Sequence, residues 1–307
     1  MTKVFIDGSA GTTGLRINER LSGRRDIELL TISDELRKDT EARREMLNMA
    51  DIVFLCLPDA AAIEAVSLVD NPNTAVIDTS TAHRTSDGWV YGFPELSDNR
   101  ERIKNSKRIA NPGCHASGVV ALLAPLVSAG IIKPDSALSA FSLTGYSGGG
   151  KKMIAEYEDA ERDILLDAPR MYGVGQTHKH LKEIVSVCGL SSAPVFCPIV
   201  APFYSGMEVS IPLHVSELCG SISDIRNTYR AYYKNGLVRF EEQADENGFL
   251  SAGALSDRDD MQITVCGNED RIVLVSRFDN LGKGASGSAI QNMNILLGVD
   301  ETTGLNV

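Results

Sequence analysis

The hydrophobic positions of the first 113 residues fall into short apolar runs separated by longer stretches of mixed polarity. Strands whose residues are nearly all apolar bury both of their faces. Such strands, alternating with helical patterns, are typical of a parallel sheet covered by helices on both sides. We predict strands at 3–7, 27–32, 51–57, 74–78 and 109–110, and helices at about 12–21, 34–49 and 59–69, with a short polar helix before residue 107.

The pattern changes after residue 113. A buried helix is predicted over 117–127, and longer strands follow, one of which alternates between apolar and polar residues over 206–215. Such alternation is typical of a half-exposed antiparallel sheet with a covering helix. We predict strands at 137–143, 194–201, 206–215, 262–266 and 271–278, and helices from about 151, over 223–233, and from the turn at 279–288 to residue 297.

These elements predict an α/β protein of two domains. A Rossmann-like, doubly wound parallel sheet over 1–113 is completed by 285–307, whose helix is long enough to return to it. The second domain, 114–284, is expected to be α+β with a mixed or antiparallel sheet.

Composition narrows the class of partner. The 307 residues carry a formal net charge of −11, which argues against a nucleic-acid or anionic-membrane surface and favours small-molecule partners. Six cysteines without C-x-x-C spacing suggest neither a disulfide framework nor a zinc ribbon and fit the reducing cytosol. We also expect no export signal and no membrane span, because no apolar run has the required length or flanks.

A glycine-rich turn follows the first predicted strand and opens a helix. Gly8, Gly11 and Gly14 are spaced G-x-x-G-x-x-G, and Thr12 and Thr13 lie between them. Glycines allow the backbone to approach a pyrophosphate at a helix N-terminus, and the two hydroxyls can add donors. The spacing is not the usual G-x-G-x-x-G, so the strand-turn-helix context carries the prediction of a dinucleotide site. A plain glycine turn is the alternative.

The end of the second strand should lie near the adenine ribose. An acid in this segment, 33–38, would favour the free 2′-hydroxyl of NAD, whereas Ser33 with Arg37 and Lys38 would accept the 2′-phosphate of NADP. A solvated helix face is the alternative for the basic pair. Both cofactors stay open on these residues.

Cys114 follows the tight turn Asn111-Pro112-Gly113 and precedes the buried helix. Unpaired backbone N–H groups and the positive end of the helix dipole at that position favour a thiolate and would stabilise an oxyanion. The alternative is a small buried hydrophobe, which is the commonest environment of an isolated cysteine.

Two histidines and a glutamate form a second cluster, His178-Lys179-His180-x-x-Glu183. On a helix, His180 and Glu183 share a face, so that the carboxylate can orient the imidazole for acid/base work. A zinc site is less favoured, since His178 and His180 would not face the same way and no further ligands are evident. We therefore predict no metal, and a purely structural role stays open for one histidine.

Several other residues are candidates for binding anions or amides. Arg84 follows the fourth strand, where a guanidinium can grip a carboxylate or phosphate. For Arg84 the alternative is a surface arginine or a structural ion pair. For the glycine cluster 144–150 and the lysine after it the alternative is a flexible solvated loop, and for the turn at 279–288 it is helix capping. The remaining candidates are Ser147 and Lys151 in and after the glycine cluster 144–150, for substrate, and Asn280 and Lys283 in the last turn, for a carboxamide and a phosphate of the cofactor.

Five segments together closely resemble the N-acetyl-gamma-glutamyl-phosphate reductase family, in its shorter branch. They are the N-terminal glycine turn, Asn-Pro-Gly-Cys114, Gly-Tyr-Ser-Gly-Gly-Gly-Lys151, His178-x-His-x-x-Glu and Asp279-Asn-Leu-x-Lys-Gly-Ala-Ser-Gly. The resemblance covers essentially the whole chain and extends to aspartate-semialdehyde dehydrogenase. One departure is His115-Ala116-Ser117, where longer members have an aromatic residue and threonine.

The resemblance implies NADP-dependent reduction of an acyl phosphate to the semialdehyde in arginine biosynthesis. Cys114 would form a thioester that accepts hydride, and His180, or else His178, would shuttle the proton. The backbone amide of Cys114 would bind the oxyanion, and Arg84 and Lys151 the anionic ends of the substrate.

The resemblance also implies an oligomerisation role for 114–284 and a homodimer or homotetramer in the cytoplasm. Two other functions stay open: an aspartate-semialdehyde dehydrogenase, which keeps the chemistry, and a non-enzymatic protein that senses a dinucleotide.

Overall fold

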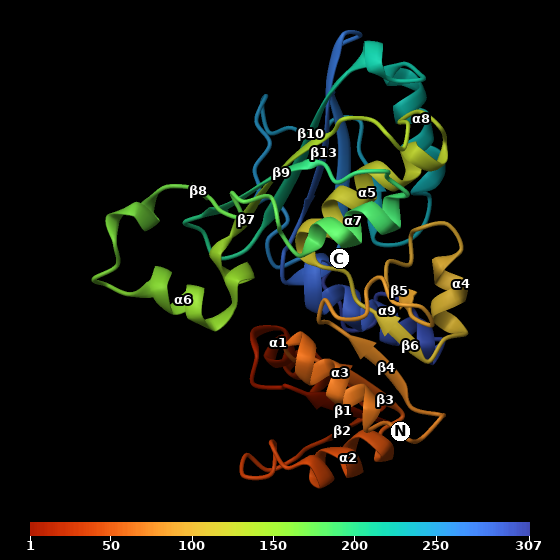
Figure 1. The fold of residues 1–307 in the computed structure, drawn as a ribbon, viewed down its shortest axis with the longest axis vertical. Helices are drawn as coiled ribbons and strands as arrows, with labels where there is room; N and C mark the ends of the chain where they lie inside the picture. The colour runs from red at the N-terminus through yellow and green to blue at the C-terminus, as the bar shows by residue number, and fades with distance from the viewer. The chain divides into compact units, whose positions relative to one another are not determined.

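The computed structural model describes all 307 residues and divides into two compact units (Figure 1). Unit 1 consists of residues 1–113 and 285–305, and unit 2 of residues 114–284 and 306–307. The first boundary therefore falls directly before Cys114. Each unit is described by itself.

Unit 1 contains a six-stranded parallel sheet in the order β2-β1-β3-β4-β6-β5. The chain runs from β1 to β2 on one side and continues with β3 on the other, so that the direction of winding reverses between β1 and β3. Such a reversal opens a crevice at the carboxyl ends of the two strands. The strands are β1 (Thr2–Asp7), β2 (Ile27–Leu30), β3 (Ile52–Leu55), β4 (Ala75–Asp78), β5 (Val90–Tyr91) and β6 (Arg108–Ala110).

Two apolar clusters show that helices cover both faces of this sheet. One cluster joins the strands to α1, α4 and α9, and the other joins them to α2 and α3. The predicted doubly wound sheet is thus confirmed, and so is the return of the C-terminal helix to it. The helices are α1 (Thr12–Leu21), α2 (Thr40–Met49), α3 (Asp59–Ser67), α4 (Asn99–Lys104) and α9 (Gly287–Leu297).

Unit 2 contains a seven-stranded mixed sheet in the order β11-β12-β13-β10-β7-β9-β8. Helix α5 packs on its central strands β10 and β13, and Gly118 allows the close approach, because an added Cβ would lie 2.5 Å from Cγ2 of Val209. The strands are β7 (Ser139–Gly145), β8 (Arg170–Met171), β9 (Val195–Ala201), β10 (Met207–His214), β11 (Val238–Phe240), β12 (Met261–Gly267) and β13 (Arg271–Phe278). The α-helices are α5 (Cys114–Ser128), α6 (Gly150–Glu158), α7 (His180–Cys188) and α8 (Ile222–Tyr232).

Some predicted boundaries differ from the structure. Helix α2 begins at Thr40 instead of 34, because Asp39 caps it by accepting a hydrogen bond from the amide of Ala42 at 2.8 Å. Helix α5 begins at Cys114, three residues earlier than the pattern indicated. The short strands β5, β8 and β11 were not predicted, and the second sheet contains two parallel pairs, β7 with β9 and β11 with β12. No helix combines the length and apolar character needed to cross a membrane.

Candidate active site

Cys114 is the first residue of α5 and is partly exposed. The chain before it is held firmly: the amide of Asn111 donates to the carbonyl of Asp78 at 2.7 Å, and its side chain donates to the carbonyl of Ala285 at 3.0 Å. Behind the thiol, an added Cβ on Gly284 would lie 3.0 Å from Cβ of Cys114. The thiol thus has the helix N-terminal position that the sequence indicated, on a tightly packed backbone.

Three histidine rings cluster next to this position in unit 2. The ring of His115 lies 5.6 Å from the rings of His178 and His180, centroid to centroid, and those two are 4.8 Å apart. Phe196 of β9 packs against His115 and His178 at 5.5 and 5.1 Å. The structure therefore brings the predicted histidine pair to the residue that follows the cysteine.

His178 and His180 have different surroundings. The backbone amide of His180 donates to Nδ1 of His178 at 3.3 Å, so that a neutral His178 carries its proton on Nε2. Burial, together with the positive charge of Lys179, lowers the pKa of His178 and favours that neutral form. His180 and Glu183 are both buried on α7, three residues apart. The orientation of His180 by Glu183 stays a prediction.

His115 and Tyr172 join the cluster without having been selected from the sequence. Nδ1 of His115 lies 2.6 Å from Oγ of Ser142, and Nε2 lies 2.5 Å from Oη of Tyr172. Burial lowers the pKa of His115 to about 3, with smaller contributions from His178 and Lys179. The only sequence signals were the departure at position 115 and a tyrosine at the start of the histidine segment.

The glycine turn of unit 1 has the geometry of an anion cradle. Gly8 has a φ of +91°, and an added Cβ would lie 2.3 Å from the carbonyl oxygen of Cys56, so the residue must be glycine. The N-terminus of α1 has neither a capping side chain nor an acid in its first turn, unlike α2 and α8, which Asp39 and Ser221 cap. The first amides of α1, at Thr12 and Thr13, are therefore suited to an anionic ligand such as a pyrophosphate.

The segment after β2 is an exposed turn. The carbonyl of Ser33 accepts hydrogen bonds from the amides of Leu36 and Arg37, both at 3.0 Å. The guanidinium of Arg37 lies 3.5 Å from the carboxylate of Asp34, and both side chains are largely exposed, so the pair is weak. An acid and a base therefore share the expected ribose position.

Arg84 is partly committed to holding its own surroundings. Its Nε donates to the carbonyl of Asn111 at 3.0 Å, and Nη2 donates to the carbonyl of Thr79 at 3.1 Å. The side chain thereby braces the turn that leads to Cys114. Its predicted contact with the substrate is a separate role that these bonds do not test.

Two of the four remaining candidates of unit 2, Ser147 and Asn280, are in contact. Oδ1 of Asn280 accepts from the amide of Gly206 at 3.0 Å, and its Nδ2 donates to Oγ of Ser147 at 3.0 Å. Lys283 is fully buried in the π-helical turn Gly282–Ser286, whereas Lys151 is exposed at the start of α6. The structure brings Ser147 and Asn280 into contact, and the cofactor and substrate roles of all four residues stay predictions.

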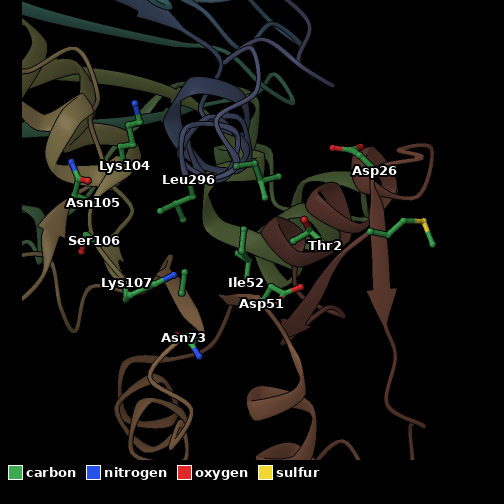
Figure 2. Close-up of a pocket in the computed structure, with 13 residues that line it drawn as sticks. Thr2, Asp26, Asp51, Ile52, Asn73, Lys104, Asn105, Ser106, Lys107 and Leu296 are labelled. Atoms are coloured by element: carbon green, nitrogen blue, oxygen red, sulfur yellow. The ribbon is translucent and has the colours of Figure 1, made fainter.

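A separate depression of about 850 Å³ lies at the amino ends of the parallel strands of unit 1 (Figure 2). Its lining includes Thr2, Ile52 and Ala75 at the strand starts, with Lys104 and Lys107 nearby. Open α/β sheets bind their ligands at the opposite, carboxyl edge, where Gly8 lies. We therefore do not assign this depression to the dinucleotide. No group of three or more His, Cys, Asp or Glu side chains is arranged to hold a metal ion.

Comparison with known proteins places both units in one family. Residues 114–280 match the model described as semialdehyde dehydrogenase, dimerisation domain, and residues 9–106 the model described as semialdehyde dehydrogenase, NAD binding domain. The N-acetyl-gamma-glutamyl-phosphate reductase 2 of Nostoc sp. is 43% identical over 318 residues, covering 99% of each chain. The enzyme of the same name from Pseudomonas putida is 42% identical over 309 residues, covering 98% of each chain.

Solved structures show the same fold at much lower identity. Aspartate semialdehyde dehydrogenase II from Vibrio cholerae has a TM-score of 0.71 at 16% identity, over 97% of this chain and 98% of that chain. The aspartate semialdehyde dehydrogenase with NADP from Candida albicans has a TM-score of 0.67 at 17% identity, over the same shares. These likenesses concern the fold alone.

The low pKa of His115 predicts a loss of stability in acid. Between pH 6.5 and pH 3 the unfolded chain binds a proton at His115 that the folded chain does not bind. The free energy of unfolding therefore decreases as the pH falls below 6.5, by about 2 kcal/mol between pH 6.5 and pH 5 from this residue. Urea unfolding followed by circular dichroism at several pH values measures the slope.

The variant His115→Gln should reduce that slope by about 1.4 kcal/mol per pH unit. His214→Gln, at an exposed histidine, is the control and should leave the slope unchanged. An identical slope in wild type and His115→Gln would contradict the assignment.

Proposed function

Because the chain belongs to the N-acetyl-gamma-glutamyl-phosphate reductase family of the semialdehyde dehydrogenases, we propose that it reduces N-acetyl-gamma-glutamyl phosphate. The products are N-acetyl-glutamate 5-semialdehyde and phosphate, the reductant is NADPH, and the reaction is a step of arginine biosynthesis. One observation carries the proposal: a cysteine at the start of a buried helix is followed directly by His115, whose ring packs against those of His178 and His180 within one unit.

The chemistry begins at Cys114. Its thiolate attacks the acyl carbon, the carbon–oxygen bond to phosphate breaks, and phosphate leaves with the electron pair, which gives a thioester. When bound, NADPH supplies the hydride that reduces the thioester carbonyl. The thiohemiacetal then collapses, so that the carbon–sulfur bond breaks, the aldehyde leaves and Cys114 regains its thiolate.

The two predicted histidines take different parts in this scheme. His180, with Glu183 on the same face of α7, takes the proton of the Cys114 thiol and returns protons to later species. His178 is held neutral, with its proton on Nε2, so it suits a hydrogen bond to a substrate oxygen. The backbone amide of Cys114 lies at the N-terminus of α5 and contributes a second donor for the oxyanion.

Unit 1 is proposed to bind the dinucleotide. The uncapped N-terminus of α1 would hold the pyrophosphate over Gly8, Gly11 and Gly14, and Ser33 with Arg37 would receive the 2′-phosphate of NADP. We assign Arg84 and Lys151 to the anionic ends of the substrate, with Ser147. We assign Asn280 and Lys283 to the cofactor. Asn280 would act indirectly, by ordering the side chain of Ser147 and the backbone of Gly206.

We propose a homo-oligomer, in the first place a homodimer, that assembles through the sheet of unit 2. The face of this sheet away from α5 carries apolar side chains on neighbouring strands, and Phe141 of β7 and Val195 of β9 are 42% and 55% exposed. Exposed apolar side chains that are contiguous on a sheet are typical of an interface.

The six cysteines form no disulfide, which supports a cytoplasmic location.

The substrate and cofactor are tested by one paired assay. Phosphate-dependent oxidation of N-acetyl-glutamate 5-semialdehyde and of aspartate semialdehyde is measured with NADP and with NAD. We expect kcat/KM to be at least about 100-fold higher for the acetylated semialdehyde, and higher with NADP, since a missing hydrogen-bonded group costs such factors. A preference for aspartate semialdehyde would make the chain an aspartate-semialdehyde dehydrogenase.

The nucleophile is tested by Cys114→Ser. Turnover should fall by about 10³-fold or more, because an alcohol in place of the thiolate cannot form the thioester, while NADP binding stays within about twofold of wild type. The matched control is Cys219→Ser, at an exposed cysteine, which should retain full activity. Retained turnover in Cys114→Ser would sink the mechanism, and no turnover in the wild type with tight NADP binding would favour the sensor.

The assembly is tested by light scattering of the purified chain. A homodimer has twice the chain mass of 33.1 kDa, and Phe141→Asp should shift it toward the monomer, because a carboxylate would be buried in the interface. Phe249→Asp, at a loop residue that is 76% exposed, is the control and should not change the mass. A monomeric wild type, or a dimer insensitive to Phe141→Asp, would contradict this face.

A further inference from the structure

Ser142, His115 and Tyr172 form a continuous hydrogen-bonded chain in unit 2 that the scheme above does not use. Ser142 lies on β7 and is fully buried, and its Oγ is 2.6 Å from Nδ1 of His115. On the other side of the ring, Nε2 is 2.5 Å from Oη of Tyr172. The two hydroxyls thus occupy both nitrogens of the residue next to the nucleophile.

His115 is neutral at every pH at which the enzyme would work. Its imidazole is 3% exposed, and burial lowers its pKa to about 3. A neutral imidazole has one N–H and one lone pair, so that one hydroxyl must donate to the ring and the other must accept from it. The nitrogen of His115 that carries the proton therefore fixes the direction of all hydrogen bonds from Ser142 to Tyr172.

Counting hydrogen bonds at Ser142 decides the direction. His115 is the only hydrogen-bond partner that the structure gives Oγ of Ser142, and the side chain has no access to water. A buried O–H without an acceptor is costly, whereas an unused lone pair on oxygen is tolerated better. Ser142 should therefore donate to Nδ1, which places the proton of His115 on Nε2.

This tautomer leaves the proton of Tyr172 available. Nε2–H of His115 donates to Oη of Tyr172, so that the phenolic O–H is directed elsewhere. The phenol keeps its proton, because burial raises the pKa of Tyr172, and the negative charge of Cys114 raises it further. The hydroxyl contacts the ring of the residue that directly follows Cys114, and this contact places it beside the start of α5. The backbone amide of Tyr172 donates to the carbonyl of Pro198 at 3.0 Å, and this bond holds Tyr172 beside β9.

We propose that Tyr172 is a catalytic hydrogen-bond donor at Cys114 and that Ser142 and His115 are positioning residues that direct its O–H. The inference rests on the proposed function, since it assigns a donor to the same nucleophile. The donor stabilises the thiolate and then the negative charge that develops on the acyl oxygen during attack. A chain of hydrogen bonds pointing one way polarises each member, so that Tyr172 becomes a stronger donor than an isolated phenol.

The experiment compares Tyr172→Phe, Ser142→Ala and the double variant in the full-length enzyme. We expect Tyr172→Phe to lower kcat of phosphate-dependent semialdehyde oxidation by about 10- to 100-fold with KM changed less than about twofold. Alkylation of Cys114 by iodoacetamide at neutral pH should slow as well. Tyr157→Phe is the control, because its hydroxyl accepts only from Arg170 in the same unit, and both rates should match wild type.

Ser142→Ala should lower kcat by a smaller factor, and adding it to Tyr172→Phe should cause no further loss, because it acts through Tyr172. Independent losses that multiply would overturn the positioning role of Ser142. Unchanged kcat and alkylation in Tyr172→Phe, with Cys114→Ser inactive, would overturn the donor and leave the proposed function standing. Activity retained in Cys114→Ser would instead overturn the proposed function itself.

The tautomer of His115 provides a readout that does not depend on activity. Nitrogen-15 correlation spectra of the histidine-labelled enzyme, assigned with His115→Gln, distinguish a proton on Nε2 from one on Nδ1. We expect the Nε2–H form in the wild type and a mixture in Ser142→Ala. The Nδ1–H form in the wild type would overturn the proposed direction.

Discussion

The burial of α5 is the constraint on which the site in unit 2 depends. The helix is buried over almost its whole length, and Gly118 brings its backbone against β10 and β13. Pro125 lies within it and has no N–H for the carbonyl of Ala121, but the hydroxyl of Tyr233 donates to that carbonyl at 2.7 Å. The helix therefore stays regular in an apolar environment, and its first residue, Cys114, cannot shift without moving the core. The position of Cys114 is thus set by the packing of α5.

The same burial restricts the charges that the site can hold. Three imidazoles within 6 Å of one another cannot all be protonated in a low-dielectric environment, and desolvation lowers the pKa of both His115 and His178. A neutral ring can still orient hydrogen bonds when its tautomer is fixed. For His178 the backbone amide of His180 fixes the tautomer by donating to Nδ1. Dense packing thus separates the histidines into those that orient hydrogen bonds and one, His180, that we assign to carry a proton.

Local patterns were sufficient for the fold but only partly for the site. Apolar runs and glycine turns predicted most strands and helices of both sheets, because each such element depends on residues close together in the chain, and the length of the last helix predicted its return. The partners of His115 lie 27 and 57 residues away, and their contact depends on how β7 packs beside α5 and how the chain enters β8 and β9. A periodic pattern of apolar residues does not show which distant side chains come into contact. The start of α2 was misplaced for a similar reason, since a helical pattern does not show which acid becomes the cap.

Residue type alone also does not separate a ligand-binding side chain from one that holds the scaffold. Arg84 and Asn280 were selected as polar residues at functional positions, and both make well-defined hydrogen bonds to the backbone of their own unit. A guanidinium has five donors, and two bonds of Arg84 brace the turn before Cys114, whereas the bonds of Asn280 engage both ends of its amide. The capacity left after internal bonds are counted is thus the physical criterion for a direct contact. By that criterion the structure shows Asn280 as a residue that orders its own unit, through Ser147 and the backbone of Gly206.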